Sequence, residues 1–258
     1  MTQFRFGKHP PKNDFRTLRF KKYLKSDIAP PPSAEDKLDQ VYKNLKMKTP
    51  NPAQLFPMDG NDTYGDCTIA ALAHAETVFR GLVGKQMIMP SQDVVKLYLK
   101  LTKGVDSGMN ELDVLNYWQS NRVSGDELIA YAKLDPKNHA EIEQALHLFG
   151  GVYLGFQCQK NCVQEFQAHK PWTPGPLTND GHAVYAVAYD SDGVTVLTWG
   201  NTQTATWAWW DECVDEAYAL LPPEAQKPGF APGFDFAQLK ADLASVSQES
   251  AGPKAHKG

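Results

Sequence analysis

The sequence has few cysteines and no long apolar run, and both absences limit what the protein can be. Its 258 residues include four cysteines, which are too few and too unevenly spaced for a disulfide framework. No stretch approaches the length of a membrane span, and the basic start lacks the apolar run of a signal peptide. We therefore expect no membrane partner and a protein that is cytoplasmic or carried in a particle.

The sequence also lacks a large net charge, but its charges are unevenly distributed. The formal net charge is −4, whereas residues 1–48 hold twelve Lys and Arg against five Asp and Glu, so 12 − 5 = +7. Aromatic and leucine residues lie among these charges, and Pro30 to Pro32 form a stiff spacer. We expect residues 1–57 to form a basic arm that either docks on an acidic protein surface or wraps its own body. Nucleic-acid binding is not expected, because no base-reading motif accompanies the charge.

Metal-ligand clusters are missing as well. Cys158 and Cys162 form the segment CQKNC, which has the spacing of a disulfide or of half a zinc site. No second cysteine pair and no histidine cluster accompany it, so buried or surface thiols are the expected state. We expect no metal and no cofactor.

The segment from Asp59 to Gly84 carries the reactive group that the sequence does offer. A Gly-rich turn precedes Cys67, and the apolar residues after it recur at helical spacing, with Asp66 as the expected N-cap. Cys67 then occupies the first helical position, where the helix dipole favours thiolate over thiol. The Asp66 carboxylate opposes this effect, so a histidine partner is still needed.

Asn61 lies six residues before this cysteine, since 67 − 61 = 6. Its side-chain amide and the Cys67 backbone amide could stabilise the oxyanion that forms when the thiolate attacks a carbonyl. The segment NDTYGDC resembles the nucleophile turn of papain-like cysteine peptidases, with Asn61 where that family has a glutamine. The chain departs from the family at Thr68, where a tryptophan is usual.

His182 is the expected general base. It begins a β-rich run, follows Gly181, and stands in a GHAV context that resembles the histidine of the same family. His74 is the nearest rival because it lies on the Cys67 face of the helix. It would sit about 10 Å along the axis at 1.5 Å per residue, which favours packing or a surface position.

The third catalytic position departs from the family pattern. Papain-like enzymes have an asparagine just before Ser-Trp-Gly, whereas VLTWG places Leu197 there, and leucine cannot hydrogen-bond. Thr198 is the favoured partner for His182 and Asn201 is the alternative. The Trp199 ring is expected to cover the contact from water, as the tryptophan of the family does.

The resemblance implies an α+β papain-like two-lobed fold with an N-terminal extended arm. We expect a helical lobe over about 61–134 and an antiparallel β lobe over about 136–221, within a peptidase domain at 58–222 and before an extension at 223–258. The pattern predicts a hairpin across residues 190–193, a short helix from Asp211 to Leu221, a helix from Phe234 to Leu243 and a disordered tail.

The motifs NDTYGDC, ELDVLNYW, LFGGVYLG and GHAV…TWG look like those of uncharacterised bacterial and phage proteins. The implied function is a cysteine peptidase that cleaves an amide bond through Cys67 and His182, with Asn61 and Thr198 in support. Its substrate would be a peptide or a peptidoglycan amide. The alternatives are an inactive, virion-associated structural or attachment protein of a phage particle, a peptidoglycan endopeptidase, and transglutaminase-like or amidase chemistry.

Overall fold

The chain folds around one antiparallel sheet with helices on both faces. The computed structural model describes residues 3–226 and 231–250. The helices are α1 (Lys37–Asn44), α2 (Pro52–Leu55), α3 (Cys67–Leu82), α4 (Ser91–Leu101), α5 (Glu111–Ser120), α6 (His139–Phe149), α7 (Cys162–Gln167), α8 (Trp207–Cys213), α9 (Phe236–Ser250) and the 3-10 turns η1 (Phe20–Tyr23) and η2 (Pro223–Gln226). The strands are β1 (Glu35–Asp36), β2 (Ala130–Lys133), β3 (Val152–Gln159), β4 (Leu177–Tyr189), β5 (Gly193–Thr198), β6 (Asn201–Thr206) and β7 (Val214–Leu221). The expected α+β class is confirmed.

The sheet has the strand order β2-β7-β3-β4-β5-β6, and β1 pairs with β4 in addition. Successive side chains of a strand point to opposite faces, and β4 shows this directly. Val184 and Ala186 pack into a core with α6 and α8, whereas Tyr185 and Val187 pack into a second core with α3. The sheet is therefore buried on both faces at its centre, and β4 contributes to both cores.

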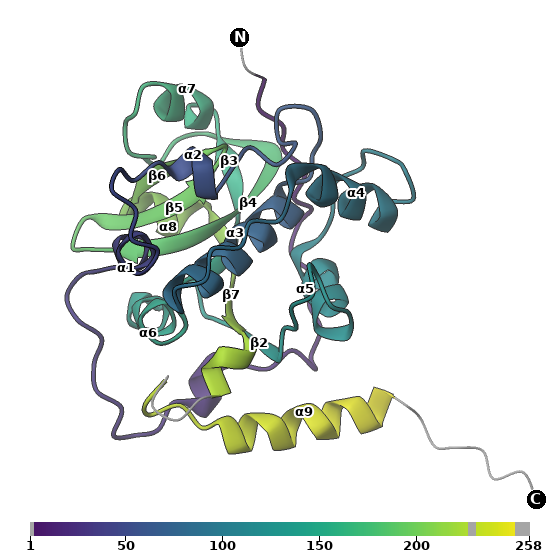
Figure 1. The fold of residues 1–258 in the computed structure, drawn as a ribbon, viewed down its shortest axis with the longest axis vertical. Helices are drawn as coiled ribbons and strands as arrows, with labels where there is room; N and C mark the ends of the chain where they lie inside the picture. The colour runs from purple at the N-terminus through teal and green to yellow at the C-terminus, as the bar shows by residue number, and fades with distance from the viewer. Residues whose placement is uncertain (1–2, 227–230, 251–258) are drawn as a thin grey trace, which may run out of the picture.

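Helix α3 packs directly against this sheet. The Phe79 ring meets the Tyr185 ring edge-on with 6.2 Å between centroids, and the Tyr153 hydroxyl donates a 2.9 Å hydrogen bond to the carbonyl of Thr68. Figure 1 shows α3 through the middle of the molecule, with strands on one side and α4 and α5 on the other. The Thr68 contact fixes the first turn of α3 on β3, and the Phe79 contact fixes its later turns on β4.

One expected helix is a strand. The prediction of a helix from Asp211 to Leu221 is correct only as far as Cys213, because α8 ends there and Val214–Leu221 form β7. Strand β7 pairs with β2 on one side and β3 on the other. A strand paired on both sides and covered on both faces has a continuous apolar run, which periodicity alone cannot separate from a buried helix.

The basic arm lies on its own body rather than extending from it. Phe20 and Tyr23 of η1 are buried in the core with α6, and β1 pairs with β4. Helix α1 packs on α3, where Val41 fills the space beside Gly81. This is the second of the two alternatives that the composition left open, and docking of the arm on an acidic partner stays a prediction.

At the other end, α9 is longer than the predicted helix, and Tyr23 of the arm donates a 2.8 Å hydrogen bond to its Asp242. The tail predicted to be disordered begins after Leu243. That prediction is wrong as far as Ser250, because α9 continues to that residue, and residues 251–258 lie outside the described residues. None of the helices in the described ranges combines the length and apolarity that a membrane span requires.

The arm offers a matched pair of phenylalanines for a stability measurement. Phe20 is 0% exposed and contacts the Phe149 and Phe234 rings, whereas Phe15 is 94% exposed. Phe20→Ala should lower the free energy of unfolding in urea by about 3–5 kcal/mol, because it empties a packed core site. Phe15→Ala should change it by less than about 0.5 kcal/mol. Equal effects of the two substitutions would show that the arm does not belong to the core.

Candidate active site

Cys67 is the first residue of α3, and Asp66 precedes the helix, as the sequence predicts. The Asp66 carboxylate does not cap the helix. It instead accepts a hydrogen bond from Nδ2 of Asn61. The Cys67 side chain is completely buried. Its sulfur therefore lies at the positive end of the α3 dipole but out of contact with water.

Burial outweighs the helix dipole at this thiol. Burial, with smaller contributions from the Asp66 and Glu111 carboxylates, raises the pKa of Cys67 to about 12. The backbone N–H groups of Ala183 and Gly7 point at the sulfur and act in the opposite direction. The expectation that the helix start favours the thiolate is therefore wrong for Cys67 as it is buried here, because its thiol is protonated at neutral pH.

His182 lies on β4 and is also completely buried. Its Nε2 lies 2.8 Å from the hydroxyl oxygen of Thr198, the last residue of β5. Burial lowers the pKa of His182 to about 3, so its imidazole is neutral at pH 7. Within the described part of the chain, Nδ1 has no hydrogen-bond partner. The ring is therefore held by one nitrogen and leaves the other available as a base.

Trp199 covers one face of this imidazole. The two rings stack with 4.6 Å between centroids and an angle of 26° between planes. The backbone of Trp199 has a φ of 49°, in the left-handed region, and Gly200 follows with a φ of 75°. These two residues form the tight turn between β5 and β6, which places the indole over His182 as the sequence predicts.

The strand register places Thr198, and not Asn201, beside the imidazole. Thr198 and Asn201 face each other across the β5–β6 turn. The side-chain oxygen of Asn201 accepts a hydrogen bond from the backbone N–H of Thr202. Leu197, at the position of the family asparagine, is buried opposite Tyr185.

Asn61 lies in the turn before α3 and is almost completely buried. One N–H of its side chain donates to Asp66, and its backbone carbonyl accepts a 2.7 Å hydrogen bond from the N–H of Arg5. Burial raises the pKa of Asp66 to about 8. The amide carries a second N–H, so the bond to Asp66, the residue before Cys67, does not use its full donor capacity.

The His74 side chain is held by neighbouring residues, as its distance from Cys67 along the helix predicts. Its Nε2 lies 3.1 Å from the carbonyl oxygen of Pro57 and 3.2 Å from a carboxylate oxygen of Asp59. The ring also meets Phe56 edge-on. These partners hold His74 on the face of α3 that meets the segment before the Asn61 turn.

Helix α3, which begins at Cys67, packs on strand β4, which carries His182. One of the two backbone N–H groups that point at the Cys67 sulfur belongs to Ala183, the residue after His182. No hydrogen bond joins the sulfur to the imidazole within the described residues. The α3–β4 interface thus holds a buried, neutral thiol and a buried, neutral imidazole.

Residues 5–9 of the arm lie against Cys67 and Gly181, a position that the composition of the arm does not predict. The N–H groups of Gly7 and Lys8 donate to the carbonyl of Gly181 at 3.2 and 3.0 Å. On the other side, Met109 donates to the Gly7 carbonyl at 2.8 Å, and His9 donates to the Met109 carbonyl at 2.9 Å. Figure 1 shows the purple N-terminal segment passing between the sheet and α5. A peptide main chain therefore bridges the two walls of a cleft.

Three glycines make room for this main chain. A Cβ on Gly65 would lie 2.8 Å from the Phe6 carbonyl oxygen, and a Cβ on Gly108 or Gly181 would collide with the backbone of Gly7 or Lys8. These glycines come from the turn before α3, the segment before α5 and the middle of β4. Their wide separation in the sequence explains why no local pattern predicts the cleft.

The remaining cysteines lie outside this cleft. Cys158, Cys162 and Cys213 are buried and free, and the Cys158 and Cys162 thiols form a hydrogen bond with each other. In residues 3–226 and 231–250 no group of three or more His, Cys, Asp or Glu side chains could hold a metal ion. The CQKNC segment therefore contributes thiols to the core of the β lobe.

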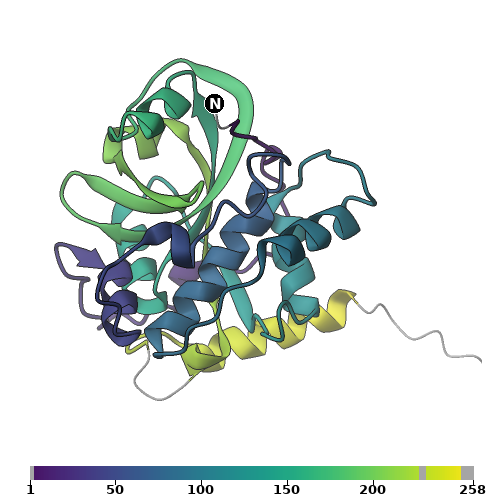
Figure 2. The same ribbon diagram turned by 45° about the horizontal axis from the view of Figure 1, so that its top comes forward.

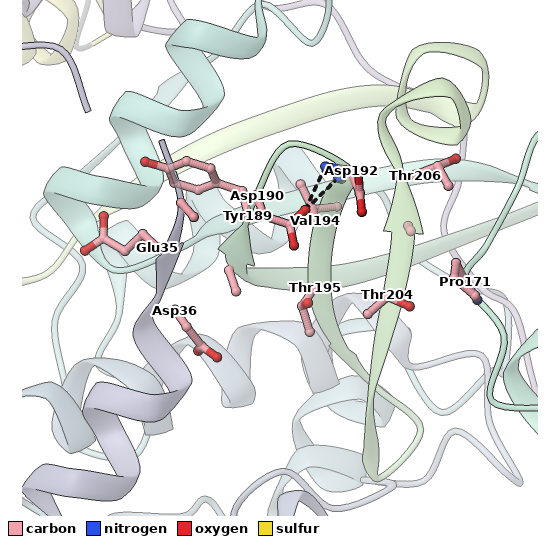
Figure 3. A pocket seen from close by; sticks show the side chains of 14 residues that line it. Glu35, Asp36, Pro171, Tyr189, Asp190, Asp192, Val194, Thr195, Thr204 and Thr206 are labelled. Atoms are coloured by element: carbon pink, nitrogen blue, oxygen red, sulfur yellow. Dashed lines mark hydrogen bonds between the residues drawn. The ribbon is translucent and has the colours of Figure 1, made fainter. Parts of the chain in front are cut away.

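A separate hollow of about 490 Å³ lies at the far end of the β4–β5 hairpin. Figure 3 shows Asp190 and Asp192 on its turn, with Thr195 and Thr204 on the neighbouring strands and Glu35 opposite. None of the four candidate catalytic residues lines this hollow. Its acidic and hydroxyl side chains offer no nucleophile with a neighbouring base.

The protonation state of Cys67 gives a direct test of the closed cleft. Only the thiolate reacts with iodoacetamide, so the alkylation rate of Cys67 should be low at pH 7 and rise about tenfold per pH unit up to pH 10. Peptide mapping by mass spectrometry separates Cys67 from the other cysteines, and Gly7→Val should speed its reaction at pH 7. A rate that levels off below about pH 8.5, the ordinary cysteine pKa, would contradict the buried thiol.

Comparison with known proteins identifies the architecture. No protein-family model matches the chain, and no curated protein matches its sequence. Xylellain, a cysteine protease from Xylella fastidiosa, matches with a TM-score of 0.61 at 17% identity, over 85% of this chain and 97% of its own. A procathepsin B from Trypanosoma congolense matches with a TM-score of 0.57 at 11% identity, over 84% of this chain and 86% of its own.

A third match is the structure of the cysteine protease and lectin-like domains of Cwp84 from Clostridium difficile. It has a TM-score of 0.57 at 13% identity, over 86% of this chain and 57% of its own. At such identities the likeness concerns the arrangement of helices and strands. The chain has the papain-like two-lobed α+β fold, with Cys67 and His182 on the facing elements of its two lobes.

Proposed function

We propose that the protein is a thiol hydrolase of the cysteine peptidase type, which cleaves an amide bond in an extended peptide. One observation carries the proposal: the main chain of residues 7–9 lies in front of Cys67 and His182 and pairs with both walls of the cleft. The glycines around it leave space for a backbone and not for side chains. A cleft of this shape fits a peptide substrate.

The chemistry follows from the positions of the groups. With the Nε2 proton of His182 donated to Thr198, Nδ1 takes the proton of Cys67, and the thiolate attacks the carbonyl carbon. A carbon–sulfur bond forms, and the oxyanion is stabilised by the Asn61 amide and the Cys67 backbone N–H. The carbon–nitrogen bond then breaks, and the amine leaves with the proton from His182. Water, deprotonated by His182, hydrolyses the thioester and returns the free thiol.

Residues 5–9 fill the cleft in this structure, so turnover requires these residues to leave it. Removing them admits water to Cys67 and His182, which reduces the desolvation that keeps both groups neutral. Gly7→Val is the most direct way to open the cleft, because a side chain at residue 7 collides with the Gly65 carbonyl.

A protein that keeps the fold without turnover is the second candidate. The complete burial of Cys67 and His182 favours it, together with Leu197 at the position of the family asparagine, which leaves Thr198 as the partner of His182. A peptidoglycan endopeptidase would use the same residues and differ only in substrate. Assays on an opened variant distinguish these functions.

In the Gly7→Val background, Cys67→Ala and His182→Ala should each abolish hydrolysis of peptide substrates, because one removes the nucleophile and the other its base. Cys158→Ala, in the same background, is the matched control and should retain turnover. The measurement is release of a fluorophore from quenched peptides and from purified peptidoglycan. Retained hydrolysis in Cys67→Ala would assign the reaction to another group.

Thr198 should act by orienting the imidazole. In the opened variant, Thr198→Val should lower kcat by about fivefold with little change in KM, because one buried hydrogen bond contributes about 1 kcal/mol. Thr198→Ser keeps the hydroxyl and should restore most of the rate. Equal rates for Val and Ser would show that the contact with His182 serves packing only.

Asn61 should matter when negative charge develops on the carbonyl oxygen. Asn61→Ala in the opened variant should lower kcat on the order of a hundredfold with KM nearly unchanged. Steady-state kinetics on one quenched peptide measure both constants. An effect confined to KM would assign Asn61 to substrate binding instead.

A further inference from the structure

Lys8 is a buried cation inside the cleft. Its side chain is 1% exposed, and its ammonium group lies 2.9 and 2.8 Å from the two carboxylate oxygens of Asp215 and 3.2 Å from Glu216. Its main chain belongs to the segment that bridges Gly181 and Met109. The side chain therefore leaves the peptide backbone next to Cys67 and ends in a pocket of opposite charge.

Glu111 is the third carboxylate of this pocket. It is completely buried, and neither of its carboxylate oxygens has a hydrogen-bond partner among the described residues. A Cβ on Gly155 would collide with the stem of Lys8 and lie 2.8 Å from Glu111 Oε1. The missing side chain at Gly155 thus provides the channel through which the lysine stem reaches the carboxylates, with Glu111 alongside.

The pocket is built by both lobes and is held in place by the fold. Glu111 begins α5, whereas Asp215 and Glu216 lie on β7. The Tyr218 hydroxyl donates a 2.8 Å hydrogen bond to the second oxygen of Glu216, which fixes that carboxylate. Burial and the neighbouring Glu216 raise the pKa of Glu111 well above its ordinary value.

Holding the arm does not account for three carboxyl groups around one ammonium. Burying acidic side chains without hydrogen-bond partners is costly, and an apolar side chain in an apolar pocket would anchor the arm at least as well. The two carboxylate oxygens of Glu111 can each accept a hydrogen bond that Lys8 does not donate. A cation with more N–H donors, such as a guanidinium group, would supply these hydrogen bonds.

We infer that Glu111, Asp215 and Glu216 form a substrate pocket for a basic side chain, and that Lys8 occupies the place of a lysine or arginine of the peptide to be cleaved. The inference rests on the proposed function, because it takes the cleft in front of Cys67 as a peptide site. The protein then selects peptides with Lys or Arg at a fixed distance from the scissile bond.

Peptide binding tests the pocket without requiring turnover. The full chain carrying Gly7→Val, Lys8→Ala and Cys67→Ala presents an emptied pocket and no nucleophile. A synthetic peptide of residues 3–11 should bind at least about tenfold more tightly by calorimetry than the same peptide with norleucine in place of Lys8, because norleucine lacks the charged donor. Glu216→Gln should remove most of this difference, and Glu212→Gln, an exposed matched control on α8, should leave it intact.

Equal binding of the two peptides, absence of binding by either, or a preference that survives both Glu216→Gln and Glu111→Gln would overturn the inference. If the triple variant does not fold, Lys8→Ala alone gives a second measurement. n-Butylamine should raise the Tm of Lys8→Ala and not that of Lys8→Ala with Glu216→Gln, and an equal response of the two would also overturn it.

A turnover panel separates this inference from the proposed function. With Cys67 restored, quenched peptides that differ only in Lys, Arg or norleucine report both cleavage and preference. A binding preference for lysine without cleavage of any peptide leaves the pocket in place and refutes the hydrolase. Cleavage of all three peptides at equal rates supports the hydrolase and refutes the pocket.

Discussion

The packing of the first turn of α3 against β3 and β4 is the constraint on which the site depends. The Tyr153 hydroxyl ties β3 to the carbonyl of Thr68, and the N–H of Ala183 points at the Cys67 sulfur. Figure 2 shows α3 between the curved sheet of one lobe and the helices of the other. Because β4 carries His182, fixing α3 on β4 also fixes the distance between the two reactive side chains. The β5–β6 turn then adds Thr198 and Trp199 from the same sheet.

Exclusion of water is the largest influence on the pKa values of Cys67 and His182. A working thiol–imidazole pair needs charge on both groups, yet dry surroundings move their pKa values apart, to about 12 for Cys67 and about 3 for His182. Phe6 contributes to this dryness, since its ring meets the imidazole edge-on at 5.7 Å. Under the proposed function, withdrawal of the arm would admit solvent and bring these two pKa values closer together.

Local patterns predict most of the site. The N-cap position of Asp66, the helix start at Cys67 and the strand position of His182 depend on short segments, and the sequence shows them. The hairpin turn also places Thr198 near His182, because the number of residues on each side of the turn determines which residues of the two strands lie opposite each other. The choice between Thr198 and Asn201 needed the observed register, since β4 and β5 contain an irregularity between Ala186 and Ala188.

Pairing between distant segments is what the sequence could not reveal. Strand β7 looks like the end of a helix until β2 and β3 are placed beside it. The cleft likewise depends on glycines that are brought together only by the folded chain, and the pocket around Lys8 joins Glu111 to residues about a hundred positions away. A basic, aromatic arm has the same composition whether it meets a partner or its own body.

The arm and the cleft belong to one polypeptide, so the release of residues 5–9 from the cleft is an intramolecular step. Phe20 anchors the arm in the core, and the exposed Phe15 lies on the stretch that leads from it to the cleft. A peptide tethered in this way faces its site at an effective concentration in the millimolar range, so dilution of the protein does not release it. Cutting that stretch would turn residues 5–9 into a free ligand that diffuses away. The covalent continuity between Lys8 and Phe20 therefore makes the closed state independent of protein concentration, and a single backbone cleavage there would make it concentration-dependent.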